Sequence, residues 1–107
     1  MFAIKAKITK CIDDKGYPTF VECEFIDSGG ETQLFHEKDL ILGVEMLDRN
    51  SSYPMDGYVL CEIVEGQPLS GRELVKVTTP LGIESTTGET IFEIFADQLI
   101  KLDDGVK

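Results

Sequence analysis

Residues 21–37, VECEFIDSGGETQLFHE, alternate between apolar and charged side chains along their first half. Val21, Cys23 and Phe25 occupy every second position, which is typical of a strand that buries one face. Two glycines follow, where positive backbone angles allow a tight turn, and residues 31–37 predict the returning strand. The stretch therefore predicts a β-hairpin whose second face is rich in carboxylates.

Similar alternation predicts strands on both sides of this hairpin. Residues 2–12 predict a first strand with two lysines on its outer face. Further strands are expected over residues 58–66 and 72–79, and residues 83–99 predict a strand, a Thr-Gly turn, a second strand and a closing helical turn. Six or seven short strands in one domain of 107 residues predict a mainly β fold, a small antiparallel β-barrel that is either SH3-like or OB-like.

The segment between the two halves of the predicted sheet, residues 38–56, does not follow the period of a strand. Apolar residues lie at helical spacing there and Asp39 is placed to cap a helix, but Gly43 weakens it. We therefore expect a short helix or an irregular connection. Tyr53 and Met55 lie near its end, where they are either exposed apolar anchors for a partner or part of a loop folded back onto the core.

The register of the last long strand stays open. Residues 91–96 are almost uniformly apolar, so the period does not select an inward face. Either Phe92 and Ile94 or Ile91 and Phe95 face the core.

Length and composition are those of an ordinary globular domain. Hydrophobic residues make up 42% of the chain and charged residues 28%, which suits one packed core. No apolar run approaches the roughly 20 residues that cross a bilayer, and the N-terminus lacks the pattern of a signal peptide, so we expect a cytoplasmic protein. Cys11, Cys23 and Cys61 form no CxxC pair, so we expect reduced structural thiols, with no metal and no cofactor.

Charge is distributed unevenly along the chain. The net charge is −10, and residues 22–65 hold eleven acids and two bases, so this segment alone carries −9. Such a charge argues against nucleic acid and anionic membranes as partners, because both are themselves negatively charged. It favours a basic protein, which the acidic segment would attract by electrostatic steering.

The sequence carries no catalytic signature. His36 is the single histidine, without a nucleophile motif or a phosphate-binding loop, so we expect a strand histidine hydrogen-bonded to a neighbour and no enzyme. The candidate partner-binding residues are acids of the middle segment and one tyrosine: Glu22, Glu24, Glu37, Asp39, Glu45, Asp48, Tyr53 and Glu62. We expect them to form one acidic face on strands two to four and on the connection after strand three.

Two stretches, TFVECEFIDSGGETQLFHEK at residues 19–38 and GIESTTGETIFEIFADQL at residues 82–99, resemble parts of small uncharacterised bacterial proteins of about this length. Acidic single-domain proteins of this kind include immunity proteins of bacterial toxin systems. The resemblance implies a bacterial, cytoplasmic β-domain, and it transfers no functional residue to this chain.

Three functions from different classes are compatible with these features. The first is a non-enzymatic protein-binding module, of which an immunity protein that neutralises a basic toxin is one concrete form. The second is a structural or homo-oligomeric β-domain, a homodimer for example, in which an apolar strand packs against a copy of itself. The third is a small-ligand-binding barrel, which a defined pocket lined by His36 and several acids would favour.

Overall fold

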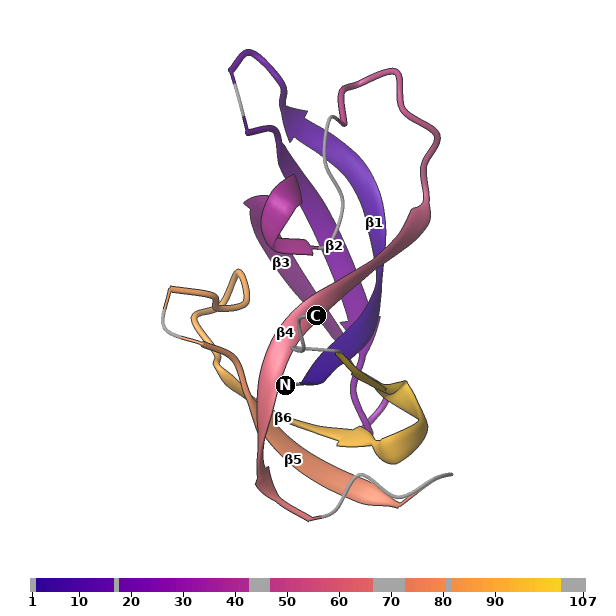
Figure 1. Cartoon of the computed structure of the whole chain (residues 1–107), viewed down its shortest axis with the longest axis vertical. Helices are drawn as coiled ribbons and strands as arrows, with labels where there is room; N and C mark the ends of the chain where they lie inside the picture. Colours follow the sequence, from indigo (N-terminus) through magenta and orange to yellow (C-terminus); the bar gives the residue numbers. More distant parts are fainter. Residues whose placement is uncertain (1, 17, 43–46, 67–72, 81, 103–107) are drawn as a thin grey trace.

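The computed structural model describes residues 2–16, 18–42, 47–66, 73–80 and 82–102. Their fold is mainly β, as the sequence predicts, and the antiparallel sheet curls into a half-barrel (Figure 1). The strands are β1 (Phe2–Asp13), β2 (Phe20–Ile26), β3 (Thr32–Lys38), β4 (Met55–Glu65), β5 (Leu74–Thr78), β6 (Ile91–Phe95) and β7 (Leu99–Lys101). Two 3-10 helices accompany them, η1 (Asp39–Leu42) and η2 (Ala96–Gln98). No helix among the described residues has the length and hydrophobicity needed to cross a membrane.

The strand order in the sheet is β3-β2-β1-β4-β5-β6, and β7 returns to pair with β1. The β5–β6 hairpin is followed by η2, which is the closing helical turn expected from the sequence. This turn directs β7 antiparallel to the beginning of β1, so the last described strand lies beside the first.

The predicted hairpin forms between β2 and β3, and its apolar side chains enter the core. Val21 and Cys23 are wholly buried, and Phe25 is nearly so. Phe25 packs against Phe35 of β3 and Phe92 of β6, with ring centroids 5.4 to 5.8 Å apart among the three. Such aromatic contacts favour a fixed arrangement of the two sheet halves around a shared core.

The open register of β6 is settled by its pairing with β5. Phe92 and Ile94 are buried, opposite two buried valines of β5, whereas Ile91 is exposed and Phe95 is half-buried. Cross-strand neighbours share one face of a sheet, so the inward-facing valines of β5 select the predicted register in which Phe92 and Ile94 face the core.

The prediction of a strand before the Thr-Gly turn is wrong, because residues 83–90 form no strand. The Ser85 backbone N–H donates to the Glu89 carbonyl at 2.9 Å, and Ser85 Oγ accepts from the Glu89 N–H at 3.0 Å, so these residues form a tight turn. The Thr86 N–H donates to the Leu34 carbonyl at 2.8 Å, which fastens this turn to the edge strand β3. The seventh strand is β7 instead, whose three residues are too few to show a period in the sequence.

β1 changes partners along its length. One edge pairs with β4 over residues 2–8. The other edge pairs with β7 over residues 2–4 and with β2 from Lys7 onward. In these described ladders Lys5 and Ala6 therefore have no strand partner on the second edge.

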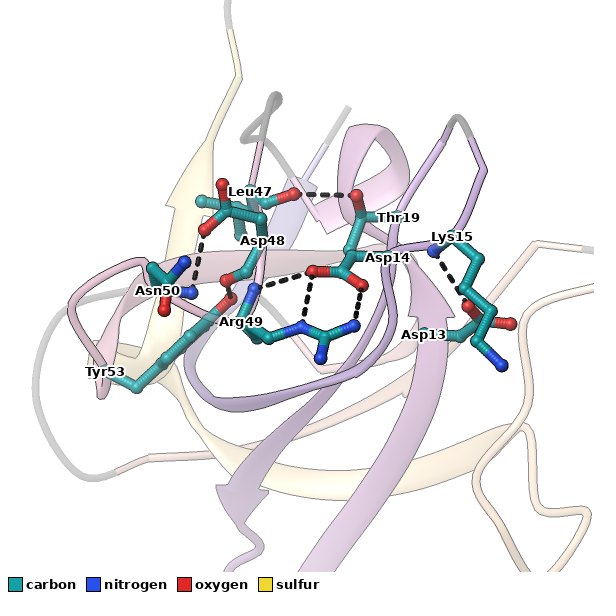
Figure 2. A network of polar contacts seen from close by, with 9 residues as sticks. All are labelled: Asp13, Asp14, Lys15, Thr19, Leu47, Asp48, Arg49, Asn50 and Tyr53. Atoms are coloured by element: carbon teal, nitrogen blue, oxygen red, sulfur yellow. Dashed lines mark hydrogen bonds and ion pairs between the residues drawn. The ribbon is translucent and has the colours of Figure 1, made fainter.

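The connection between β3 and β4 contains η1 and, over residues 47–54, bends and turns, which confirms the predicted short helix or irregular connection. Gly43, which was expected to weaken a helix, lies outside the described residues. An ion pair joins this connection to the β1–β2 loop (Figure 2). The Arg49 guanidinium donates to both carboxylate oxygens of Asp14, at 2.9 and 3.2 Å, and the Arg49 N–H donates at 3.0 Å. These bonds hold the pKa of Asp14 at about 2.

Candidate functional site

Glu22 lies on the outer face of β2 and is engaged by two neighbours. Its carboxylate accepts a hydrogen bond from Thr9 Oγ1 at 2.9 Å and lies 3.1 Å from His36 Nε2. Burial opposes the charged form of this carboxyl, but the contacts from His36 and Thr9 outweigh burial and lower the pKa of Glu22. His36 is therefore the hydrogen-bonded strand histidine that the sequence predicts.

The lysines of β1 lie beside the acids of the neighbouring strands. In the β1–β2 ladder Lys7 is opposite Glu24 and Lys10 is opposite Glu22. Lys7 also forms an ion pair with Asp56 of β4. The outer face of β1 and β2 thus alternates in sign, and the acidic half of the hairpin is matched by cations from the first strand.

Glu37 lies elsewhere. It is two positions after the inward-facing Phe35, so it lies on the same face of β3. Burial raises the pKa of Glu37, and the hydrogen bond from the Lys38 N–H only partly opposes this rise. Glu37, His36 and Glu84 line an open hollow of about 680 Å³ next to the loop that follows β5. The hollow is open rather than a defined pocket, so the small-ligand alternative stays a prediction. The described residues include no group of three or more His, Cys, Asp or Glu placed to hold a metal ion.

Asp39 and Tyr53 support the connection before β4. Asp39 is wholly buried; its Oδ2 accepts from the Leu47 N–H at 3.2 Å, and its Oδ1 has no hydrogen-bond partner among the described residues. Tyr53 and Met55 are half-buried against the core, and the Tyr53 hydroxyl donates to the Asp48 carbonyl at 2.6 Å (Figure 2). The loop therefore folds back onto the core, and Tyr53 and Met55 are not exposed anchors.

The predicted residues do not come together in one acidic face. The prediction that Asp39 belongs to such a face is wrong, because Asp39 is wholly buried. Glu37 lies on the opposite side of the sheet from Glu22. Glu62 is exposed on β4 in the other half of the sheet, and Glu45 lies outside the described residues. The reason is the register, which distributes acids that are close in sequence over both faces and over several strands. Contact of the remaining residues with a partner stays a prediction.

The β2–β3 turn lies next to η2 (Figure 1). A second group of acids gathers there. Asp27 shapes this turn: its Oδ1 accepts from the backbone N–H groups of Gly29 and Glu31, and its Oδ2 accepts from Gln33 Nε2, each at 2.9 Å. Burial opposes the charge, yet these hydrogen bonds lower the pKa of Asp27. Gly30 has a φ of +85°, the positive angle that its sequence position predicts.

Hydrogen bonds fasten the turn to β6 and η2. The Ser28 N–H donates to the Glu93 carbonyl at 2.9 Å, and Ser28 Oγ donates to the Glu93 carboxylate at 3.1 Å. Gln98 bridges two strand ends, because its Nε2 donates to the Ile26 carbonyl at 2.7 Å and its Oε1 accepts from the Phe95 N–H at 2.8 Å. Elements far apart in the sequence are thereby held side by side.

We call this region the acidic end. It consists of four carboxylates around two apolar side chains: Asp27, Glu31, Glu93 and Asp97 around Ile26 and Phe95. Two shallow hollows meet there, and no described Lys or Arg lines either of them. Ile26 is 56% exposed, and none of the four carboxylates forms an ion pair with a described residue.

The residues predicted from the sequence do not include the acidic end. Asp27 and Glu31 lie within the charged hairpin, but Glu93 and Asp97 follow much later in the chain. A local signal was present, since the Ser-Gly-Gly turn carries an acid on each side. Tertiary hydrogen bonds from the turn to β6, and from Gln98 of η2 to Ile26, hold the two pairs near each other.

Comparisons of the chain with protein-family models, with curated proteins and with solved structures found no match. Its class is therefore defined by its own fold and site. It is a small antiparallel β half-barrel that gathers acids around exposed Ile26 and half-buried Phe95, at the end formed by η2 and the β2–β3 turn.

Proposed function

We propose that this chain is a non-enzymatic protein-binding module whose acidic end meets a basic segment of another protein. One observation carries the proposal: the acidic end presents exposed Ile26 and half-buried Phe95 within a rim of carboxylates that no described cation pairs. Apolar anchors inside a polar rim are the usual arrangement of interface hot spots. An immunity protein that neutralises a basic toxin is one form of such a module.

The electrostatics of the acidic end suit a cationic partner. Carboxylates that lie close together repel one another, so a Lys or Arg from a partner relieves this repulsion in addition to its own attraction. The net charge of −10 extends the attraction beyond the contact surface. Because salt screens exposed charges over about 8–10 Å at physiological ionic strength, the binding weakens as salt rises.

The test is capture of a partner from a lysate of the source organism at low and at high salt. The tagged protein is compared with the Glu31→Lys/Asp97→Lys variant, which reverses two exposed charges at the acidic end. The matched control, Glu84→Lys/Glu89→Lys, makes the same charge change at exposed positions that line neither hollow of the acidic end. Thermal unfolding verifies that all three proteins fold.

We expect a basic protein that the wild type and the control retain, and that high salt and the acidic-end variant release. Equal loss from both variants would mean that total charge, rather than the acidic end, governs the capture, and would overturn the proposal. Failure of the wild type to retain any protein at low salt would overturn it as well.

Self-association is a second candidate, favoured by the outer face of β5 and β6. Leu74 is 52% exposed and Ile91 is 58% exposed on this face, which is large for apolar side chains of a sheet. An apolar contact of this kind persists at high salt. Sedimentation of the wild type and of a Leu74→Lys/Ile91→Lys variant distinguishes the candidates. A wild type that sediments as a dimer, with a variant that sediments as a monomer, would support self-association.

A further inference from the structure

The outer face of β5 and β6 repeats one arrangement of side chains along its length. Its residues alternate with buried ones in both strands, so they point away from the core. Three pairs of outward residues lie opposite one another in the ladder: Leu74 and Phe95, Lys76 and Glu93, and Thr78 and Ile91. The middle pair joins opposite charges, and each flanking pair contains an apolar side chain that is more than half exposed.

Two further glutamates, Glu62 and Glu65, lie beside this face on β4. The Lys76 ammonium is 3.5 Å from the Glu65 carboxylate, and both side chains are exposed. Such a surface ion pair contributes little, so Lys76 is able to contact a second carboxylate. Glu93 forms no ion pair with a described residue, and its carboxylate accepts a hydrogen bond from Ser28 Oγ. Lys76 thus has a glutamate on each side, and Glu93 is the one without a cation of its own.

A second copy of the chain matches this pattern of charges. A two-fold axis that runs parallel to the strands, between β5 and β6, exchanges the two strands. It therefore places Lys76 of each copy on Glu93 of the other, and it places the two residues of each flanking pair on one another. An axis across the strands would instead bring Lys76 onto Lys76 and Glu93 onto Glu93. The charges select the first axis, about which the face is complementary to itself, as a closed two-fold contact requires.

We propose that two copies of this chain associate through the outer face of β5 and β6, about a two-fold axis parallel to these strands. The contact consists of two Lys76–Glu93 pairs between the copies, flanked by Leu74 packed on Phe95 and by Ile91. This inference rests on the second candidate function, self-association, and adds its symmetry and its contacts.

The contact also concerns the acidic end, because Glu93 and Phe95 belong to both surfaces. A second copy on this face covers these two residues, so it competes there with a basic partner. The dimer is accordingly the form of the protein without its partner.

The experiment exchanges the two charges in separate proteins. Sedimentation is measured for the wild type, for Lys76→Glu, for Glu93→Lys and for an equimolar mixture of the two variants. The salt concentration is about 0.15 M, where the Debye length is about 8 Å, so acids outside the contact repel one another little. The matched controls are Lys10→Glu and Glu84→Lys, which make the same charge changes at exposed positions outside β5 and β6. Thermal unfolding verifies that every variant folds.

We expect the wild type and both controls to sediment as dimers. Each single exchange places like charges opposite each other twice, so it should weaken the dimer about tenfold. The mixture should recover the dimer, because each reversed charge then faces an opposite charge in the other protein. The Lys76→Glu/Glu93→Lys variant should dimerise by itself for the same reason.

Two outcomes would overturn the inference while leaving self-association intact. One is a dimer that Leu74→Lys/Ile91→Lys dissociates but that neither single exchange weakens. The other is a pair of single variants that dissociate and do not recover when mixed, since the two charges would then not meet across the axis. A wild type that stays monomeric at the highest concentration measured would overturn both the inference and the second candidate function, and would leave binding at the acidic end to its own test.

Discussion

The outer face of β1 and β2 and the acidic end are built from the same kinds of residue, yet their charges are arranged in opposite ways. On the outer face Glu22 is engaged by Thr9 and His36, and Lys7 lies between acids of two neighbouring strands. At the acidic end, carboxylates from the β2–β3 turn, β6 and η2 surround apolar side chains and form no ion pair with a described residue. Lys76 lies opposite Glu93 in the β5–β6 ladder, but it forms its ion pair with Glu65 instead.

The difference shows that sheet register, rather than local composition, determines where charge is left unmatched. The hairpin at residues 21–37 is strongly acidic in both regions. Its first strand lies beside the lysines of β1, whereas its turn lies beyond β1 and meets further acids instead. Carboxylates without an ion pair to a described residue therefore gather where β1 no longer reaches.

The largest effect is expected at the residue that holds the acidic end together. Gln98→Ala removes the hydrogen bonds to the Ile26 carbonyl and the Phe95 N–H, which should lower the free energy of unfolding by about 2 kcal/mol. Urea denaturation measures this change. The neighbouring exposed Asp97 is the control, and Asp97→Ala should change stability by less than about 0.5 kcal/mol. Equal effects of the two substitutions would show that Gln98 does not fasten this region.

A smaller effect should separate the two kinds of glutamate. Glu22→Ala removes the acceptor for Thr9 and the partner of His36, so it should cost about 1–2 kcal/mol of stability. Glu31→Ala removes an exposed carboxylate at the acidic end and should stay within about 0.5 kcal/mol of the wild type. The comparison between the regions would fail if Glu31→Ala destabilised the protein as much as Glu22→Ala.

The smallest effect concerns pH and the ion pair between Asp14 and Arg49. Because Arg49 lowers the pKa of Asp14 to about 2 in the folded protein, the pair contributes stability above the ordinary aspartate range and loses it as pH falls through about 2. The wild type should therefore exceed Asp14→Asn in melting temperature at neutral pH, and the gap should close in strong acid. Arg49→Gln should show the same pH dependence. A gap that does not change with pH would contradict this assignment.

Much of the fold follows from local patterns in the sequence. The alternation of residues 21–26 correctly predicts β2 and its inward face, because one buried face requires period two. Residues 91–96 leave their register open, since apolar side chains on both faces remove the period, and pairing with β5 supplies the missing information. The closing turn was predictable, but β7 was not.

The candidate site depends on contacts that local patterns do not contain. The place of Glu24 opposite Lys7 depends on the register between two strands. Asp27 and Asp97 come together only because η2 returns to the β2–β3 turn. Burial of Asp39 likewise depends on the Leu47 N–H across a connection. The excess of acids was visible in the sequence; its location on the molecule was not.

The changing partners of β1 also affect how the chain is made. β1 is synthesised before the other described strands, but its edges pair with β2, β4 and finally β7. Synthesis proceeds at roughly 5–20 residues per second, so several seconds pass between the synthesis of Ile4 and Ile8 and that of the later strands that bury them. Folding dominated by such distant pairings is expected to take milliseconds to seconds. A chain cut before residue 99 would keep the beginning of β1 as an open edge, ready to pair with other chains.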